Sequence, residues 1–440
     1  WRLDDVITRA DILGLIARQE ELNFEPGSEH VYSNSGYTLL AETVFRVTGR
    51  TFREWTGEAV FAPLGMTDTH AHDDHRMIVR NRAESYQRVP GGGYRRSPLN
   101  YSNVGATSLF TTVGDLALWA SNLLDPRFAP DVIAQMAEPT ELTTGAPLTY
   151  GFGLGLRERD GRRVIEHGGA DAGFRSHFAV FPDDDLAIVV LSNAAEVGAG
   201  QLAHRAARVL LESRRPIDVS NEVSSAPSGE PDPAAEPREP ADVDISEEDL
   251  EPLTGYYWSA RADLVRSIRL DRGSLWYQRG PGNSTRLRYV GGSVFHMIGV
   301  DPSLEVRFEA TDQAVDAMVV QGPGDPPLRF ERIDPVGSPI PFGDYEGVYV
   351  SDEVGVSLRV LVIDGGLSLR HPRHGTSKLQ PVAADRFSSP EWWLGSLRFT
   401  RDGDGAVDGF RSTSGRVRNL RFRRDDSLGE PSRFRMPPPR

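Results

Sequence analysis

The second half of the chain repeats itself. Sliding the sequence along itself places "LTGYYWS" (253–259) on "YEGVYVS" (345–351), "AVDA" (314–317) on "AVDG" (406–409) and "LRFER" (328–332) on "LRFRR" (420–424), each time at an offset of 92 residues. Each copy alternates apolar and polar residues between Gly and Asp turns, a pattern typical of antiparallel strands. A small sheet hides its edges by closing on itself. The sequence therefore predicts two antiparallel β-barrel repeats of the lipocalin-like kind, at 251–334 and 342–425, and a tail at 426–440.

The first 213 residues mix helical and strand patterns. Apolar residues at three- and four-residue spacing predict helices at 11–20, 35–48, 113–123 and 201–213. Four apolar segments joined by short Gly/Asp turns predict an antiparallel meander, with strands at 150–156, 162–167, 174–181 and 186–193. Helices, then strands, then a closing helix indicate a sheet covered by helices, so the whole chain is predicted to be a multidomain α+β protein.

Residues 214–250 read as a linker between these regions. They contain six prolines and no aromatic residue, and between 222 and 251 there are eleven acidic residues against one arginine. Such a segment buries too little apolar surface to offset its ordering entropy. We expect it to be disordered, acidic and extended by its own charge.

The charge and residue inventory narrows the classes of function. The formal net charge of -14 repels a phosphate backbone, so nucleic acid is not an expected partner. Cysteine is absent, which excludes thiol catalysis, disulfides and thiolate metal ligands. No apolar run reaches the ~18 residues of a membrane-spanning helix. Lys378 is the only lysine among the 49 basic residues, so any reaction that needs a lysine from this chain must use it.

Two short motifs carry side chains suited to catalysis, and the first is "HVYSNSGY" (30–37). Tyr32 and Asn34 flank Ser33 just before an apolar helical pattern. A phenol can transfer a proton and an amide can hold a substrate carbonyl. The simpler interpretation is that Ser33 or Asn34 only caps the helix that begins near residue 35.

The second motif is "VIEHGGADAGF" (164–174). His167 stands at a strand end and is followed by Gly168 and Gly169, where the lack of a Cβ would let a ligand approach the backbone. The backbone N–H of Ala170 is then a candidate donor to an oxyanion. A structural histidine in a glycine-rich turn is the alternative.

Together these motifs resemble the serine β-lactamase and penicillin-recognising hydrolase family, in particular its class C and D-aminopeptidase-like branch. That family pairs Tyr-x-Asn with a later Lys-Thr-Gly or His-x-Gly strand motif. The stretches "FAPLGMTDTH" (61–70) and "GATSLFTTVGDLALW" (105–119) resemble it as well, and the likeness covers about residues 1–212. The arrangement of two barrel domains after the catalytic domain in the sequence resembles that of the D-aminopeptidases.

The resemblance implies a serine hydrolase that attacks amide, ester or β-lactam carbonyls of a small molecule or peptide through an acyl-enzyme, without a cofactor. It implies catalytic roles for Tyr32 and His167, and substrate binding by Asn34, Gly169 and Ala170. It also implies a bacterial protein of the cell envelope or a secreted one, with the cytoplasm as the remaining option. A His at position 167 is mostly neutral at pH 7, where a Lys would be charged. We therefore expect esters, amides or N-terminal D-residues to be preferred over substrates with a free carboxylate.

The family's nucleophile is absent from this sequence. It lies in Ser-x-x-Lys upstream of Tyr-x-Asn, whereas the residue three positions before Lys378 is Gly375. We expect residues 1–213 to be the C-terminal part of a truncated catalytic domain, a fragment whose nucleophile is not in this chain and which is inactive alone. The alternative is a natural pseudoenzyme that has lost its nucleophile.

Two alternatives use other parts of the chain. The run "THAHDDH" (69–75) matches His-x-His-x-Asp-His, a zinc signature of metallohydrolases, through His70, His72, Asp74 and His75. In this alternative, His167, His177 and His204 could complete a dinuclear site. Such a signature normally follows a buried strand, whereas here a helix end and turn precede it, so our expectation is no bound metal. The other alternative is a non-catalytic protein that binds a ligand through its paired barrels.

Overall fold

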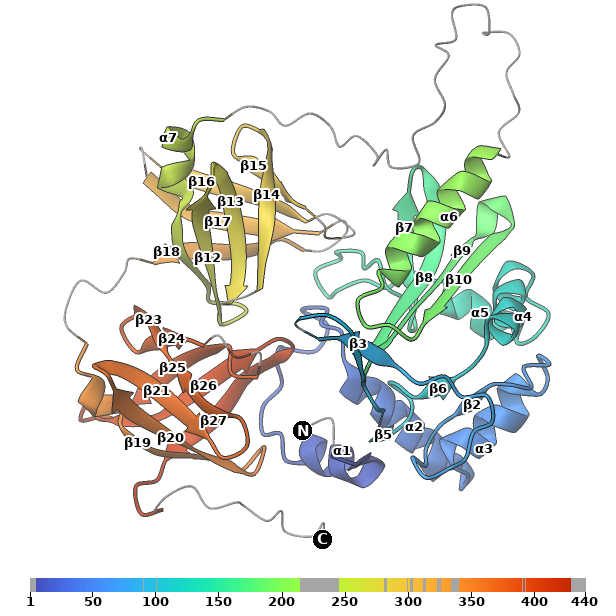
Figure 1. The fold of residues 1–440 in the computed structure, drawn as a ribbon, viewed down its shortest axis with the longest axis horizontal. Helices are drawn as coiled ribbons and strands as arrows, with labels where there is room; N and C mark the ends of the chain where they lie inside the picture. Colours follow the sequence, from blue (N-terminus) through green and yellow to red (C-terminus); the bar gives the residue numbers. More distant parts are fainter. Residues whose placement is uncertain are drawn as a thin grey trace, which may run out of the picture. The chain divides into compact units, whose positions relative to one another are not determined.

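The computed structural model describes residues 5–89, 91–99, 101–280, 283–298, 300, 304–311, 314–322, 326–333, 340–389, 391 and 393–428, except for 214–244. The chain forms two compact units (Figure 1). Among the described residues, the first unit holds 5–17 and 32–213, and the second holds 18–31 and 245–428. The predicted linker from 214 to 244 and the tail from 429 lie outside the described residues.

The first unit contains helices, short strand pairs and one larger sheet. Its helical elements are α1 (Arg9–Ala17), α2 (Asn34–Thr48), α3 (Phe52–Thr56), the π-helical turn η1 (Gly57–Phe61), α4 (Val113–Leu124), α5 (Pro130–Met136), the 3₁₀ turn η2 (Pro182–Asp184) and α6 (Ala199–Ser213). Its short strands are β1 (Ile7–Thr8), β2 (His70–Ala71), β3 (Tyr86–Arg88), β4 (Tyr94–Arg96), β5 (Tyr101–Ser102) and β6 (Leu109–Phe110). They form the pairs β1–β5, β2–β6 and β3–β4.

The larger sheet is the predicted antiparallel meander. Its strands are β7 (Gly155–Arg159), β8 (Arg162–Asp171), β9 (Phe174–Phe181) and β10 (Leu186–Ser192), in the order β10-β9-β8-β7. The strand predicted at 150–156 is misplaced, because Gly153 takes a left-handed φ of 78° and interrupts the extended run. β7 begins only at Gly155.

Helices cover both faces of this sheet. Successive residues of a strand point to opposite sides, so apolar residues are presented on both faces. Val164 and Ala179 pack with Ala207 and Leu211 of α6, which crosses one face (Figure 1). On the other face Val180 forms a buried cluster with Ala120, Leu123 and Ile133 of α4 and α5, and Ile165 and Phe178 pack against it. The sheet is therefore the buried central layer of the first unit.

The second unit contains the two predicted barrels. The first is a closed, up-and-down, antiparallel barrel. It is preceded by α7 (Glu247–Leu250) and the 3₁₀ turn η3 (Glu251–Leu253). Its strands are β11 (Gly255–Ser259), β12 (Leu264–Asp271), β13 (Ser274–Gly280), β14 (Asn283–Gly291), β15 (Val294–Met297), β16 (Glu305–Thr311), β17 (Ala314–Gln321) and β18 (Leu328–Ile333).

The second barrel is a nine-stranded antiparallel sheet in the order β22-β21-β20-β19-β27-β26-β25-β24-β23. After the 3₁₀ turn η4 (Phe342–Tyr345) its strands are β19 (Gly347–Ser351), β20 (Val356–Ile363), β21 (Gly366–His371), β22 (Gly375–Lys378), β23 (Gln380–Ala383), β24 (Arg386–Ser388), β25 (Ser396–Arg401), β26 (Val407–Ser414) and β27 (Val417–Arg424).

The extra strand is a split one. Shifted by 92 residues, β14 of the first barrel corresponds to residues 375–383, which are β22 and β23 together. Between them, Leu379 is buried and its N–H still donates to the carbonyl of Leu367 on β21, at 2.8 Å. Pro381 in β23 lacks an N–H to give to a neighbouring strand. The two edge strands therefore follow each other directly in the chain, and the second barrel is nearly closed.

Buried hydrogen bonds recur in the two barrels. The fully buried Tyr257 and Tyr349 donate their hydroxyls to the carbonyls of Leu253 and Tyr345, both at 2.8 Å. Each donor and each acceptor has its counterpart 92 residues later. The internal repeat is therefore present in the packing and hydrogen bonding of the two barrels as well as in their sequences.

The predicted linker ends too late. Residues 245–250 were expected to be disordered, yet Ser246 caps α7 and Leu250 is only 2% exposed within the first barrel's core. Two apolar residues, Ile245 and Leu250, in an acidic stretch give no periodic signal. The burial of Leu250 nevertheless makes this segment part of the barrel.

A short segment near the start of the chain, 18–31, packs in the second unit. The side-chain amide of Asn23 donates to the carbonyl of Arg416 at 2.8 Å and accepts from the N–H of Arg418 at 3.2 Å. Glu29 pairs with Arg418 at 2.9 Å, and both side chains are nearly buried. Glu21 pairs with Arg411 at 2.7 Å. We call residues 18–31 the strap. It leads directly into Tyr32.

In the part of the chain that the structure describes, no helix combines the length and apolar character needed to cross a bilayer.

Candidate active site

The Tyr32-Ser33-Asn34 motif lies at the start of α2. Ser33 is the N-cap, and its hydroxyl accepts a hydrogen bond from the N–H of Gly36 at 3.1 Å. This satisfies one of the free donors of the first helical turn. The capping interpretation is therefore correct for Ser33, and it leaves Tyr32 and Asn34 on either side of the cap with exposed side chains.

His167 lies on β8 beside Tyr32. The centroids of the two rings are 5.9 Å apart, although the residues are 135 positions apart in the chain. Alternation along β8 turns His167 to the face opposite Val164 and Glu166. The convergence of the phenol and the imidazole, the central expectation from the sequence, is present in the fold.

Tyr150 is a third member of this cluster that the sequence did not reveal. Its hydroxyl lies 3.0 Å from Nε2 of His167, and its ring meets that of Tyr32 edge-on at 6.4 Å. It stands in the irregular segment before β7, where no periodic pattern distinguishes it. Its place directly before the glycine-rich "GFG" (151–153) was the only available signal.

The hydrogen bonds fix the tautomer of His167. Nδ1 lies 2.8 Å from the carbonyl oxygen of Gly168, which can only accept, so Nδ1 carries the proton. In the neutral ring Nε2 is then an acceptor, and the hydroxyl of Tyr150 donates to it. Burial lowers the pKa of His167 and raises the pKa of Tyr150 to about 12. The imidazole of His167 and the phenol of Tyr150 are thus both uncharged at neutral pH.

Gly168 and Gly169 make room for side chains of β9. A Cβ on Gly169 would lie 2.3 Å from the hydroxyl oxygen of Ser176, and one on Gly168 would lie 3.4 Å from Nδ1 of His177. The approach of a ligand to these glycines stays a prediction. Any side chain at Gly169 would displace Ser176.

The end of β8 has one open edge. β7 pairs with β8 only as far as Glu166, whereas β9 pairs with it through Ala170 to Asp171. In an antiparallel pair, backbone groups point alternately toward the partner strand and away from it. Some of the backbone polar groups of residues 167–171 therefore face away from β9. The role of the Ala170 N–H and that of Asn34 stay predictions.

The comparisons with known proteins agree with these motifs. The family model described as Beta-lactamase matches residues 3–212. Residues 3–212 belong to the β-lactamase family. This β-lactamase-family domain contains Tyr32, Tyr150, His167 and both glycines after it.

Curated relatives match a stretch of similar length. The D-aminopeptidase of Gluconobacter oxydans is 31% identical over 204 residues, which are 44% of this chain and 38% of that protein. The D-aminopeptidase of Brucella anthropi is 26% identical over 209 residues, 47% of this chain and 40% of that protein. The match spans about two fifths of the length of these relatives.

Among solved structures, the octameric penicillin-binding protein homologue from Pyrococcus abyssi is 17% identical with a TM-score of 0.44, covering 75% of this chain and 71% of that one.

The alternative zinc signature does not assemble. Asp74 is paired with Arg76 on the surface, and the ring of His75 bonds the hydroxyl of Ser102 at 3.0 Å. Only His70 and His72 contact each other, with Nε2 and Nδ1 at 3.2 Å. Burial lowers the pKa of His72 to about 4. Among the described residues, a cluster of three metal-ligating side chains occurs elsewhere, and it shares no residue with this run.

Proposed function

We propose that this chain contains the substrate-binding part of a serine hydrolase of the D-aminopeptidase type. Such an enzyme cleaves amide bonds by acyl transfer. The observation that carries the proposal is the contact of Tyr32 with His167, at a ring separation of 5.9 Å, within a β-lactamase-family domain. The D-aminopeptidase relatives support amide hydrolysis, and esters follow the same chemistry. The substrate is a small molecule or peptide with an accessible carbonyl.

The proposed reaction forms and breaks one ester. A serine hydroxyl attacks the substrate carbonyl carbon, and its proton passes to the phenol oxygen of Tyr32. The phenol hands its own proton on, through the neutral lysine of the Ser-x-x-Lys motif, to the amine, which leaves as the amide C–N bond breaks. Water then attacks the ester and restores the serine. Asn34 holds the substrate carbonyl and the Ala170 N–H donates to the oxyanion, a type of interaction worth roughly 10²–10³ in rate.

The nucleophile is proposed to lie outside these 440 residues. Ser-x-x-Lys does not occur in the sequence, and Lys378, the only lysine, belongs to β22 of the second barrel. The cluster around His167 contains phenols and an imidazole but no lysine. We therefore expect this chain alone to form no acyl-enzyme.

Intact-mass analysis with a labelled penicillin and an activated D-alanyl ester tests the proposal. The chain as given should show no added acyl mass, whereas the chain extended by its own upstream reading frame should gain one. Tyr32→Phe should slow that acylation at least tenfold, since general acid–base groups contribute roughly 10²–10⁴. Tyr86→Phe is the matched control, because both tyrosines are similarly exposed, at 37% for Tyr86 and 38% for Tyr32. An acyl adduct on the unextended chain would refute the assignment of the nucleophile.

The neutral His167 supports a preference for substrates without a free carboxylate next to the scissile bond. Its Nε2 accepts from Tyr150 and its pKa is lowered, so it offers no cation at pH 7. His167→Lys in the extended chain should raise the rate on carboxylate-ended peptides relative to amides and esters. An unchanged ratio of the two rates would count against this preference.

A further inference from the structure

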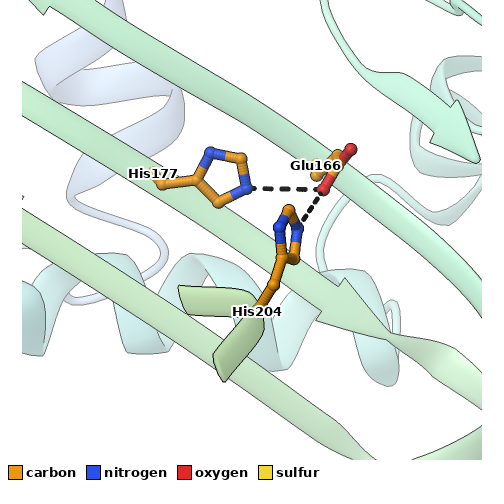
Figure 2. Close-up of side chains that lie close together, drawn as sticks. All are labelled: Glu166, His177 and His204. Atoms are coloured by element: carbon orange, nitrogen blue, oxygen red, sulfur yellow. Dashed lines mark hydrogen bonds and ion pairs between the residues drawn. The ribbon is translucent and has the colours of Figure 1, made fainter. Parts of the chain in front are cut away.

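A second cluster lies on the face of β8 turned away from His167. Glu166 of β8, His177 of β9 and His204 of α6 point toward one another (Figure 2). Oε2 of Glu166 lies 2.8 Å from Nε2 of His204 and 3.4 Å from Nε2 of His177. Glu166 is 5% exposed, and the two imidazoles are nearly buried.

The fold brings these residues together by strand register and helix packing. Gly168 pairs with His177 and Glu166 pairs with Ala179, so Glu166 and His177 share one face of the sheet. α6 packs on that face and adds His204. Glycines leave room for the His177 ring, since a Cβ on Gly168 or Gly200 would lie within 3.4 Å of its Nδ1.

The spacing of the three ligand atoms is close to that of a metal site. Zinc binds imidazole nitrogens and carboxylate oxygens at about 2.0–2.1 Å, which puts tetrahedral ligands about 3.3 Å apart. Here the three atoms lie within 4.8 Å of one another, and the oxygen is 2.8 and 3.4 Å from the two nitrogens. Small side-chain shifts would bring all three to one centre.

Two arginines hold the other oxygen of Glu166. Nε of Arg157 and Nη2 of Arg159 lie 3.2 and 3.0 Å from Oε1. They orient the carboxylate so that Oε2 alone faces the imidazoles, the kind of outer support that ligating carboxylates have. Their positive charge also opposes a cation. That charge disfavours ions bound mainly by charge, such as Mg²⁺ or Ca²⁺, more than an ion with strong affinity for imidazole.

We propose that Glu166, His177 and His204 form a binding site for a zinc-type divalent ion. Oε2 and the two Nε2 atoms are the ligands, and water completes the coordination. On binding, each neutral imidazole keeps its single proton and carries it on Nδ1. The ion joins β8, β9 and α6 behind the strand that presents His167. This proposal does not depend on the proposed hydrolase activity.

The test is a titration of the dialysed full chain with Zn²⁺ by calorimetry, with metal counting after gel filtration. The expected result is one saturable ion per chain and a higher melting temperature with Zn²⁺, but no saturable binding of Mg²⁺. His204→Ala should weaken zinc binding by at least tenfold, because even outer-shell changes at metal sites typically cost about 10- to 100-fold. The double variant His70→Ala/His72→Ala is the matched control for the contacting histidine pair, and it should bind like the parent.

Arg157→Gln keeps the result interpretable if His204→Ala fails to fold. Removing this partly exposed guanidinium lowers the local positive charge, so zinc should bind several-fold more tightly. The proposal is overturned if the parent binds no zinc above the level of buffer contamination. It is equally overturned if binding is lost with the His70/His72 variant and kept with His204→Ala.

Discussion

The two faces of β8 differ in how they hold a histidine. On one face His167 is neutral, bonded through Nε2 to the hydroxyl of Tyr150 and close to the exposed ring of Tyr32. On the other, Glu166 is a buried anion with two imidazoles and two guanidiniums around it. Thus His167 faces a partly exposed aromatic cluster, and its neighbour Glu166 faces a buried cluster of charged groups. We therefore expect the ionic face to fix the strand, and the uncharged aromatic face to be the one that serves the proposed reaction.

Replacing Glu166 should give the largest effect on this comparison. Glu166→Ala leaves two partly exposed guanidiniums and two nearly buried imidazoles without their shared acceptor, so we expect a loss near the lower end of the about 3–5 kcal/mol that breaking a buried ion pair costs. Urea unfolding, with hydrogen exchange of β8–β10 to report on the first unit, measures it. Glu158→Ala, at an exposed neighbouring site on β7, should cost less than about 0.5 kcal/mol. Equal losses in the two variants would mean that the ionic face does not fix the strand.

Gly169→Ala addresses the aromatic face. The added Cβ would meet the hydroxyl oxygen of Ser176 at 2.3 Å, so we expect a loss of about 1–3 kcal/mol from overpacking. Ser176→Gly in the same chain removes the clashing side chain and should recover most of that loss in a double-mutant cycle. Strictly additive effects in this cycle would show that the clash is not the cause.

The two faces should begin to lose stability at different pH values. Burial lowers the pKa of His167, so its contribution is full above its ordinary value of about 6.5 and falls as pH drops below it. The pKa of Glu166 is also lowered: burial opposes this shift, but the bonds from His177, His204 and Arg159 outweigh it. Its contribution is therefore lost only below an ordinary value of about 4.3.

Unfolding free energy measured from pH 8 to pH 3 distinguishes the two faces. His167→Gln should flatten the curve below about pH 6.5, and Glu166→Gln should flatten it only below about pH 4.5. If Glu166→Gln changed the slope between about pH 6.5 and 4.5, the two faces would not titrate independently.

Tyr150→Phe should produce the smallest effect. It removes the hydrogen bond to Nε2 that favours the neutral imidazole, so the pKa of His167 should rise. A bond worth about 1 kcal/mol corresponds to about 0.5–1 pKa unit. An NMR titration of the His167 ring measures the shift, with Tyr86→Phe as the control. An unchanged or lower pKa would contradict the assigned tautomer.

Much of the fold follows from periodic patterns in the sequence. The repeat predicts both barrels, and Tyr257 and Tyr349 reproduce it down to their hydrogen bonds. The meander is predicted because its apolar strands are separated by short turns. Elements that no pattern marks were missed, such as α5 (Pro130–Met136) and the π-helical turn η1 (Gly57–Phe61).

The candidate site was only half visible in the sequence. Tyr32 and His167 belong to motifs, so their contact could be expected from the family resemblance. Tyr150 lies in an irregular segment, and its contact with His167 depends on tertiary folding alone. His177 and His204 could be named from the sequence as candidate metal ligands, but not their grouping with Glu166, because that requires knowing which face of β8 each residue occupies and where α6 crosses.

The strap has a practical consequence for dissecting the molecule. The family match at 3–212 suggests a cut before the barrels, yet residues 18–31 pack in the unit that such a cut removes. Glu21 and Glu29 would lose Arg411 and Arg418, and this orphaned acidic stretch ends at the residue before Tyr32. If residues 1–213 were expressed alone, the segment that immediately precedes Tyr32 and α2 would therefore lack its packing partners. Swapping barrels between relatives would require exchanging the strap with them.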